Sequence, residues 1–573
     1  MFQKVLIANR GAIAVRIERT LEKMGVKSVA VYAKADRDSL HVEKANEAVY
    51  LGEGTVKETY LDVDKIIQAA LDTGAEAVHP GYGFLSENTL FAAKCEENHI
   101  KFIGPDASLI QLFGLKHSAR ELAEKAGVPL LPGTGLLGSL EEAVREAEHI
   151  GYPLMIKSTA GGGGIGIRIC ENEKELAASY DNVCHLAEAN FNDAGGFLEK
   201  YIRKARHVEV QIFGNGYGET AVLGERDCSV QRRNQKVVEE CPAPNLPESV
   251  RREMYCAAKK LAETSGYRSA GTVEFLYDEG EEKFYFLEVN TRLQVEHGIT
   301  EEVYGVDLVE WMIKEAAGEL KGIGDFHGEP KGHAIEVRVY AEDCINHFRP
   351  GNGRVDGVTF SEKARVETWI RKHIEISPLY DPMLAKLIVH GETREQAVGK
   401  MLEVLEETKI YGVTTNLCYL KNLISTENYR EGRLYTKMLS GFFPEEKALE
   451  VLDGGVQSTV QDAEGMIGYW TVGVPPCGAM DDYNFKIGNM LLGNPKDAAG
   501  LELTLRGGAY RFRCSVSFCI TGADMQATLD GEEIPMYTVT EAKPLQELRF
   551  KTCEKGMRTY LLLAGGIQVP KVM

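Results

Sequence analysis

Residues 4–25 read KVLIANRGAIAVRIERTLEKMG and decide the first fold assignment. The apolar run 4–8 is typical of a buried strand, a turn with one glycine follows, and residues 12–25 carry apolar side chains at helical spacing. A second apolar run at 28–32 completes the order strand, turn, helix, strand, which indicates a parallel sheet. Segments 75–88 and 101–105 again place a strand before a Gly- and Pro-rich turn. We therefore expect a Rossmann-like α/β unit over the first 110 residues. Its turn lacks the three-glycine pattern of dinucleotide-binding folds.

Composition and charge restrict the classes of protein to which the chain can belong. The 573 residues suggest about four domains at roughly 150 residues each. A content of 44% hydrophobic and 26% charged residues is ordinary for globular proteins and excludes collagen, coiled coil and wholesale disorder. The net charge of −20 disfavours nucleic acid as a partner. We find no apolar run long enough for a membrane span, no signal-peptide pattern and no metal-type spacing among the 12 cysteines, and we expect a cytoplasmic protein with reduced thiols.

A glycine-rich segment, Gly161 to Gly166, lies between two predicted strands, the first at 152–158. Glycines allow backbone N–H groups to close on phosphate oxygens, and Lys157, four residues earlier, would add a positive charge. The segment lacks the ending of a P-loop, and a run of glycines is more often a flexible turn. Both interpretations remain open at this point.

The segment 288–297, EVNTRLQVEH, is the strongest indication of a site. We interpret it as part of a strand, in which alternate residues face the same way. That face would hold Glu288, Asn290, Arg292, Gln294 and Glu296. Carboxylate and amide oxygens suit magnesium, and an arginine suits an anion, which together favour phosphoryl transfer. Glu274, also flanked by apolar residues, could share a metal with Glu288. The alternative is a solvated strand face.

Further patterns complete the survey. A polar cluster, RDCSVQRRNQK, occupies 226–236, and by pattern alone it could be a surface loop. Residues 205–300 are mostly strand-like, and helices are expected at 115–126, 393–407 and 412–426. The segment 332–343 is expected to be a strand with Glu336, Arg338 and Tyr340 on one face, so that Arg338 could also be a structural partner of Glu336 or Glu342.

Taken in order, these segments resemble the biotin carboxylase family of ATP-grasp enzymes. The matching segments cover about 1–445 and read LIANRGAIAVRIER, HPGYGFLSEN, FIGP, KSTAGGGGIG, FLEKYI, RHVEVQ, ERDCSVQRRNQKVVEE, GTVEFL, FLEVNTRLQVEH, HAIEVRVYAED and YDPMLAKL. The resemblance implies an α/β chain with a Rossmann-like N-terminal domain at 1–112, an ATP-grasp domain at 113–328 and an α+β C-terminal domain at 329–445.

The resemblance also implies roles for individual residues. ATP would be bound by Lys116, Lys157, Gly163, Gly164, Glu199, Lys200, Tyr201, Ile202, His207, Gln231, Asn234, Glu274 and Glu288. Magnesium or manganese would be held by Glu274, Glu288 and Asn290. Bicarbonate would be seated by Lys236, Arg292 and the Val295 backbone. Glu296 would remove the proton of bicarbonate, and Arg338 would stabilise the biotin enolate, so the catalytic set is Arg292, Glu296, Arg338 and Lys236.

Three positions depart from the common family pattern. Ala12 stands where a glutamate is usual, Ile165 replaces a common arginine and Asn234 a common histidine; the last two resemble the urea carboxylase branch. Residues 459–494 resemble the start of an allophanate hydrolase subunit 2 type carboxyltransferase domain. We therefore expect a linker at 446–456 and a partial, β-rich carboxyltransferase domain at 457–573.

The function implied is ATP- and bicarbonate-dependent carboxylation of biotin N1 through carboxyphosphate, as the biotin carboxylase component of a urea or related amidine carboxylase. The alternatives are the biotin carboxylase subunit of an acyl-CoA carboxylase and a non-catalytic nucleotide-binding remnant. No Met-Lys-Met attachment site occurs in the sequence. Biotin is thus expected as a substrate on a carrier protein or domain, with the remaining carboxyltransferase half on a separate chain, no nucleic acid or membrane partner, and a possible homodimer.

Overall fold

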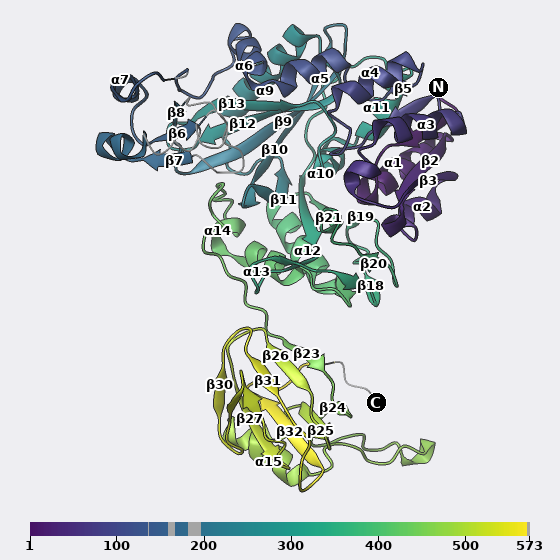
Figure 1. The fold of residues 1–573 in the computed structure, drawn as a ribbon, viewed down its shortest axis with the longest axis vertical. Helices are drawn as coiled ribbons and strands as arrows, with labels where there is room; N and C mark the ends of the chain where they lie inside the picture. The colour runs from purple at the N-terminus through teal and green to yellow at the C-terminus, as the bar shows by residue number, and fades with distance from the viewer. Residues whose placement is uncertain (136, 159–166, 181–195, 570–573) are drawn as a thin grey trace. The chain divides into compact units, whose positions relative to one another are not determined.

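The computed structural model describes residues 1–135, 137–158, 167–180 and 196–569 (Figure 1). The chain forms two compact units: Met1–Glu342 with Pro350–Phe442, and Asp343–Arg349 with Phe443–Met573. None of the helices in the described ranges has the length and hydropathy that a membrane span requires.

The first unit begins with a five-stranded parallel sheet in the order β3-β2-β1-β4-β5. The predicted strand and helix at its start are confirmed, and the helix ends at Gly25 in the left-handed conformation that glycine favours. The strands are β1 (Lys4–Ile7), β2 (Lys27–Ala33), β3 (Glu47–Gly52), β4 (Ala77–His79) and β5 (Lys101–Phe102). The helices are α1 (Gly11–Met24), α2 (Leu40–Lys44), α3 (Val63–Thr73), α4 (Thr89–Glu97) and α5 (Ala107–Gly114), with 3₁₀ turns η1 (Lys34–Asp36) and η2 (Val56–Glu58).

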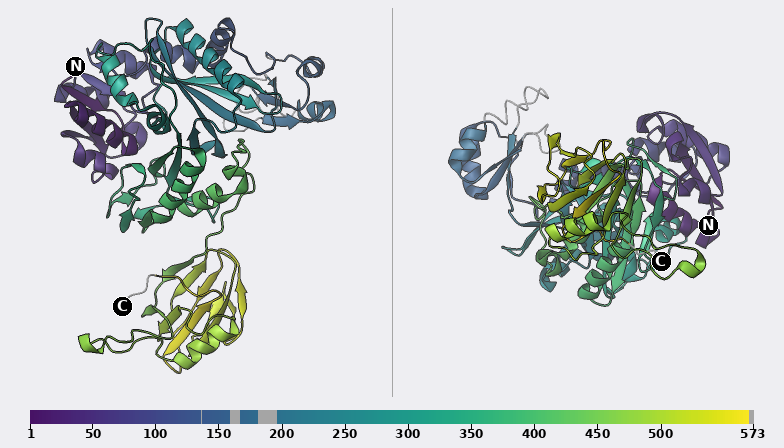
Figure 2. Two further views of the ribbon diagram at one scale, coloured as in Figure 1. Left: turned by 180° about the vertical axis from the view of Figure 1, so that it is seen from behind. Right: turned by 90° about the horizontal axis from the view of Figure 1, so that it is seen from below.

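A small lobe follows, in which a three-stranded antiparallel sheet shares an apolar core with two helical segments, residues 140–150 and residues 173–180. It projects from the rest of the first unit in the views of Figures 1 and 2. Its elements, after α6 (Lys116–Lys125), are α7 (Leu140–Ile150), β6 (Leu154–Ser158), β7 (Ile167–Cys170) and β8 (Gly196–Lys200). The expected helix at 115–126 and the expected strand at 152–158 are confirmed by α6 and β6.

An eight-stranded antiparallel sheet, β13-β12-β9-β10-β11-β14-β21-β19, forms the centre of the first unit. One face packs on α5, α6 and α9 (Glu248–Ser265) through a large apolar core. The expectation that 205–300 is mostly strand is confirmed, but it did not include helix α9, in which Val250, Met254 and Leu261 repeat at helical spacing and are buried. The strands are β9 (Ala205–Asn215), β10 (Thr220–Arg232), β11 (Gln235–Cys241), β12 (Arg268–Asp278), β13 (Lys283–Asn290), β14 (His333–Tyr340), β19 (Arg365–Thr368) and β21 (Met383–Gly391).

The remaining elements are helices and short strand pairs; the helices at 297–304 and 394–407 pack on β14 and β21, and the helix at 308–316 packs on β12 and α1. The expected helix at 412–426 is shorter, because Asn416 bonds the backbone of Arg338 and Tyr340 and so holds the preceding chain outside the helix. The helices are α10 (His297–Tyr304), α11 (Leu308–Ala316), α12 (Arg394–Glu407), α13 (Leu417–Ser425) and α14 (Glu427–Arg430). The short strands are β15 (Glu342–Asp343), β16 (Arg349–Pro350), β17 (Gly353–Arg354), β18 (Gly357–Thr359), β20 (Glu375–Ile376) and β22 (Lys409–Tyr411).

The second unit contains two five-stranded sheets, with α15 (Asp482–Leu491) packed on β27 and β32 through Phe485, Tyr560 and Leu562. The segment expected as a linker carries β23, because residues 449–453 pair with β26. One sheet comprises β23 (Leu449–Asp453), β26 (Ala509–Phe512), β31 (Glu547–Arg549), β28 (Thr528–Leu529) and β29 (Glu532–Glu533). The other comprises β24 (Ser458–Gln461), β25 (Gly500–Thr504), β32 (Arg558–Leu563), β27 (Val516–Gly522) and β30 (Thr540–Ala542), and η3 (Trp470–Val472) precedes α15.

Candidate active site

Side chains alternate between the two faces of the central sheet along β9, β12 and β13. This places acidic and basic side chains on the face opposite α9. Val208 and Val210 of β9, and Val273 and Phe275 of β12, belong to the apolar core. Their neighbours in the sequence therefore face the other way, which brings His207, Glu209 and Glu274 together. In β13 a bulge at position 287 shifts the register, so that Glu288 lies directly opposite Glu274.

Glu274 and Glu288 form a pair of like charges across two strands. Glu274 is buried; its Oε2 lies 2.9 Å from His207 Nε2, and its Oε1 accepts a hydrogen bond of 2.8 Å from Asn290 Nδ2. Burial opposes ionisation of Glu274, but Lys236 and His207 outweigh it and hold its pKa well below the usual range. The pKa of Glu288 is raised by burial and by the charge of Glu274. No cationic side chain in the described ranges forms an ion pair with Glu288. Opposed carboxylates destabilise a sheet, and a divalent cation between them would relieve this.

Lys236 is the centre of a buried ion cluster. Its ammonium lies 2.6 Å from Glu296 Oε1, 2.7 Å from Glu209 Oε2 and 3.3 Å from Glu274 Oε1. Lys236 follows a two-residue turn between β10 and β11, in which Arg233 and Asn234 both have positive φ, 50° and 65°. Turns of this kind match the twist of paired strands, and asparagine tolerates the left-handed conformation.

Glu296 is fully buried between two cations. Its Oε2 lies 3.0 Å from Arg338 Nη2, and its Oε1 contacts Lys236. Burial raises the pKa of this carboxyl, but Lys236, Arg338 and Arg226 outweigh that effect and hold the pKa well below its usual range. Arg338 also pairs with Glu239, at 2.5 Å. Glu296 is therefore ionised, and both of its neighbours are cations that an incoming anion could use.

The strand expected over 288–296 ends earlier than expected. Strand β13 stops at Asn290, residues 291–296 form a loop, and α10 begins at His297. Glu87 accounts for this, because its carboxylate accepts from the backbone N–H and hydroxyl of Thr291 and lies 2.8 Å from Arg292 Nε. The shared-face argument thus holds for Glu288 and Asn290 alone. Arg292 and Glu296 reach the site from the loop.

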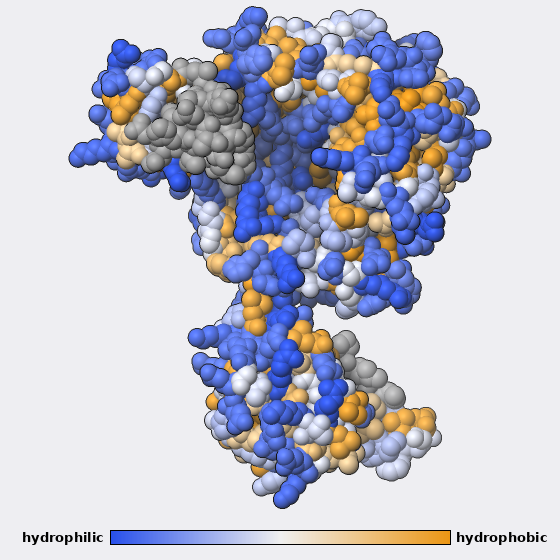
Figure 3. Space-filling view, viewed as in Figure 1, coloured by the Kyte–Doolittle hydropathy of each residue, from blue (hydrophilic) through white to orange (hydrophobic). Residues whose placement is uncertain are grey.

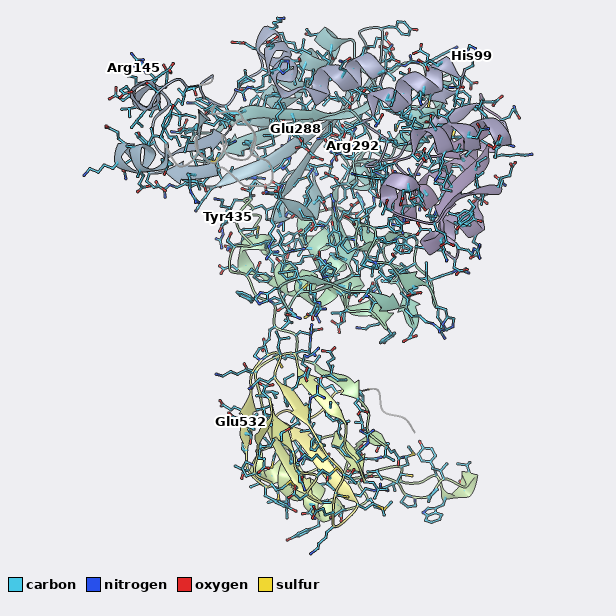
Figure 4. All side chains as sticks on the ribbon, viewed as in Figure 1. His99, Arg145, Glu288, Arg292, Tyr435 and Glu532 are labelled. Atoms are coloured by element: carbon cyan, nitrogen blue, oxygen red, sulfur yellow. The ribbon has the colours of Figure 1, made fainter. Side chains whose placement is uncertain are left out.

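Eleven of the residues to which the family resemblance gives a role line one cleft of about 670 Å³, and Gln294 lines it too. Figure 3 shows a hollow bordered by hydrophilic residues in the first unit, and Figure 4 shows Glu288 and Arg292 beside the end of β13. The eleven are His207, Gln231, Asn234, Lys236, Glu274, Glu288, Asn290, Arg292, Val295, Glu296 and Arg338.

The other expected ATP-binding residues lie outside the lining of this cleft. Lys157 of β6 forms an ion pair with Glu199 of β8, and Lys116, exposed, is the first residue of α6. Lys200, Tyr201 and Ile202 follow on from Glu199, and the Lys437 ammonium lies 4.7 Å from the centre of the Tyr201 ring. Gly163, Gly164 and Ile165 lie outside the described residues.

A second cavity, of about 280 Å³, shares Arg292, Val295 and Arg338 with the cleft. Ala12 lies in its lining, buried beside Trp369. Arg10, also in the lining, stacks on the Trp369 and Tyr380 rings at 4.7 and 4.3 Å. Arg338 therefore borders both hollows.

Sequence reasoning missed three of the carboxylates in the site, among them Glu239, which pairs with Arg338 where the sequence suggested Glu336 or Glu342. Glu209 lies between two core valines in the segment HVEVQ, the same apolar flanking that singled out Glu274. Glu87 gave no comparable signal, because its partner Arg292 is more than 200 residues away in the chain.

Comparison with known proteins gives a consistent result along the whole chain. Family models match "Biotin carboxylase, N-terminal domain" at residues 1–110, "Carbamoyl-phosphate synthase L chain, ATP binding domain" at 116–321 and "Biotin carboxylase C-terminal domain" at 336–441. The model "Carboxyltransferase domain, subdomain A and B" matches 472–573.

Relatives of two kinds are found. Urea amidolyase of Saccharomyces cerevisiae is 49% identical over 573 residues, which are 100% of this chain and 31% of that protein. Biotin carboxylase 2 of Bacillus subtilis is 46% identical over 442 residues, 77% of this chain and 99% of that protein. The chain thus spans about a third of the length of the amidolyase.

Solved structures agree with these relatives. The Kluyveromyces lactis urea carboxylase has a TM-score of 0.78 at 43% identity, over 100% of this chain and 44% of that one. The biotin carboxylase domain dimer of Hydrogenobacter thermophilus 2-oxoglutarate carboxylase, solved with MgADP and bicarbonate, has a TM-score of 0.70 at 44% identity, over 77% of this chain and 98% of that one. With these matches and the cleft described above, the chain belongs to the biotin carboxylase family.

Proposed function

We propose that the chain carboxylates N1 of biotin with ATP and bicarbonate, through carboxyphosphate, as the biotin carboxylase component of a urea or related amidine carboxylase. The observation that carries this proposal is the cluster of Lys236, Glu296 and Arg338 in the same cleft as the Glu274–Glu288 pair. A base flanked by anion-binding cations, beside a candidate metal site, is what joining bicarbonate to a phosphoryl group requires.

ATP is proposed to bind between the cleft and the small lobe. Glu274, Glu288 and Asn290 would hold Mg²⁺ or Mn²⁺, and this assignment is supported because Glu288 forms no ion pair with any residue that the structure describes. The cation, when bound, supplies positive charge that offsets the charge developing on the transferred phosphoryl group. Lys116, Lys157 and the segment with Gly163 and Gly164 would contact the phosphates. The segment from Glu199 to Ile202 would contact the adenine, with His207, Gln231 and Asn234 nearby.

Bicarbonate is proposed to bind at Lys236, Arg292 and the Val295 backbone. Lys236 would then share its charge with the substrate, which weakens its hold on Glu296 and raises the basicity of that carboxylate. Glu296 takes the proton of bicarbonate, and the resulting oxyanion attacks the γ-phosphorus of ATP, so that ADP leaves and carboxyphosphate forms. Carboxyphosphate breaks down to CO₂ and phosphate, and the released phosphate takes the proton from N1 of biotin. Arg338 stabilises the negative charge that this leaves on the ureido oxygen, and N1 then takes up the CO₂.

The partners proposed are a biotinylated carrier protein or domain and the remainder of a carboxyltransferase on a separate chain. Exposed large side chains in the loop before α15 support the second partner: Ile467, Trp470 and Val472 are 68–70% exposed. Such residues are usually covered at protein interfaces. Urea as the final acceptor is proposed from the named relatives, urea amidolyase and urea carboxylase. A homodimer through the biotin carboxylase part is proposed from the Hydrogenobacter domain, which is described as a dimer.

ATP cleavage by the purified chain tests this function. We expect ADP formation that requires magnesium and bicarbonate and becomes faster when free biotin is added. ATP cleavage that is independent of bicarbonate, or nucleotide binding without cleavage, would favour a non-catalytic remnant instead.

A further inference from the structure

The backbone of the loop 291–296 is held by side chains to which the proposed chemistry gives no role. At its start, Glu87 binds Thr291 and Arg292. At its end, the Gln294 carbonyl lies 2.8 Å from His297 Nδ1, and the Val295 carbonyl accepts a hydrogen bond of 2.5 Å from Lys386 Nζ. Two successive carbonyls of the loop are therefore bound to side chains of α10 and β21.

Lys386 is fully buried, which is rare for a lysine. It lies on β21 between Arg338 of β14 and Glu367 of β19, and both of these are its direct cross-strand neighbours. Its ammonium lies 2.7 Å from Glu367 Oε2 and 3.6 Å from Glu336 Oε2. The pKa of Glu367 is held well below its usual range by Lys386 and Arg365, so the Glu367 carboxylate balances the charge of Lys386, and the ammonium can also donate to the loop.

The direction of these two bonds fixes the direction of the peptide groups in the loop. In a trans peptide the N–H points away from the C=O of the same unit. Because the carbonyls of Gln294 and Val295 point to His297 and Lys386, the N–H groups of Val295 and Glu296 point to the opposite side. Within the described residues nothing accepts a hydrogen bond from either N–H. Val295 lines the cleft.

His297 is suited to its part of this arrangement. The ring is buried among the charged groups of Glu301, Glu367, Lys386 and Arg16, and burial lowers its pKa to about 4. It is therefore neutral at pH 7, and Nδ1 carries the proton that it donates to the Gln294 carbonyl.

We propose that Lys386 is a positioning residue for bicarbonate: by holding the Val295 carbonyl, it aims the N–H groups of Val295 and Glu296 into the cleft as donors to the anion. The inference rests on the proposed function, in which bicarbonate binds at this backbone. It adds a residue from the C-terminal part of the first unit that acts on bicarbonate and not on ATP.

The test is Lys386→Met, which keeps an unbranched side chain as far as the Cε position and removes the donor. We expect bicarbonate to bind about 10-fold more weakly or worse, since a loosened loop loses backbone bonds to a charged ligand. Binding is measured by line broadening of ¹³C-bicarbonate in NMR, with MgADP present, and separately as KM. The KM for ATP should stay within about twofold, because this interaction concerns one substrate only.

Arg365→Met is the matched control. Arg365 shares Glu367 with Lys386 and also pairs with Glu301, but it does not touch the loop. We expect this variant to melt at a lower temperature and to bind bicarbonate like the wild type. If Lys386→Met does not fold, Lys386→Met with Glu367→Gln, which removes the charge of both partners, takes its place.

The outcomes separate the inference from the function on which it rests. If the wild-type chain fails to cleave ATP with bicarbonate, the proposed function is wrong, and the NMR measurement alone decides the role of Lys386. Wild-type bicarbonate affinity in the Lys386 variant overturns the inference. So does an equal loss of affinity for ATP and bicarbonate, or failure of both Lys386 variants to fold, because each assigns Lys386 to the stability of the fold.

Discussion

At the scale of single residues, Glu296 and Arg338 form an ion pair, but we expect substitution of each to reduce a different step of the reaction. For Glu296→Gln we expect bicarbonate-dependent ATP cleavage to fall by about 10²–10⁴-fold, the usual effect of losing a general base. Nucleotide binding should persist, because Glu274 and Glu288 are untouched. Steady-state ADP release and equilibrium binding of ATP measure the two. Glu240→Gln is the control, since Glu240 is equally buried on β11 but pairs with Arg394 and His333 away from the cleft.

Arg338→Ala tests the next step of the reaction. The expected result is carboxybiotin formation reduced by about 10²-fold or more, with most of the bicarbonate-dependent ATP cleavage retained, because the guanidinium would stabilise charge on biotin. The competing role is structural, because Arg338 also pairs with Glu239. In that case ATP cleavage, carboxybiotin formation and melting temperature all fall together.

At the scale of elements, the row of charges across β11, β14, β21 and β19 should make stability depend on pH. Glu336 is buried on β14 beside Lys386, Glu239, Arg338 and Glu367, and burial raises its pKa to about 8. The folded chain therefore keeps a proton that the unfolded chain loses above its ordinary pKa of 4.5. The contribution of Glu336 to stability is complete below pH 4.5 and is lost as pH rises to about 8.

Glu336→Gln removes this titration. Between pH 5 and 8 we expect the free energy of unfolding of the variant to fall less steeply with pH, by up to about 1.4 kcal/mol per pH unit, one proton's worth. Chemical denaturation of both proteins across this range measures the difference. Parallel curves for variant and wild type would mean that Glu336 is ionised in the folded chain.

The same elements explain what could be predicted from the sequence. The apolar runs around β1 and α1 determine local structure, and they were sufficient to predict the first, parallel sheet. Glu274 stood out because its neighbours are core residues. The end of β13, the bulge at Leu287 and the role of Lys386 depend on register between strands and on Glu87, which are contacts between distant segments. No local pattern encodes them. The family resemblance supplied most of the site residues, but not what holds the loop 291–296.

At the scale of the whole molecule, the proposed function predicts that these 573 residues carry out the biotin carboxylation step by themselves. The 573 residues contain no Met-Lys-Met sequence. We expect the purified chain to show no biotin adduct by intact-mass measurement. It should carboxylate free biotin but form no product from urea when supplied alone. A biotin adduct, or urea-dependent turnover without a second protein, would contradict this division of labour.

The ion cluster at Lys236 has a consequence for selectivity. This ammonium is already neutralised by three carboxylates, so an anion cannot enter by simply filling a vacant positive site. It must replace a carboxylate as the counter-ion of Lys236, and the net charge of the pocket then has little effect on which anion binds. Binding depends on whether the incoming anion is planar and carries oxygen atoms with the spacing of the carboxylate that it displaces. Nitrate, which has that outline but no proton to give up, should compete with bicarbonate, whereas chloride, a sphere of equal charge, should not.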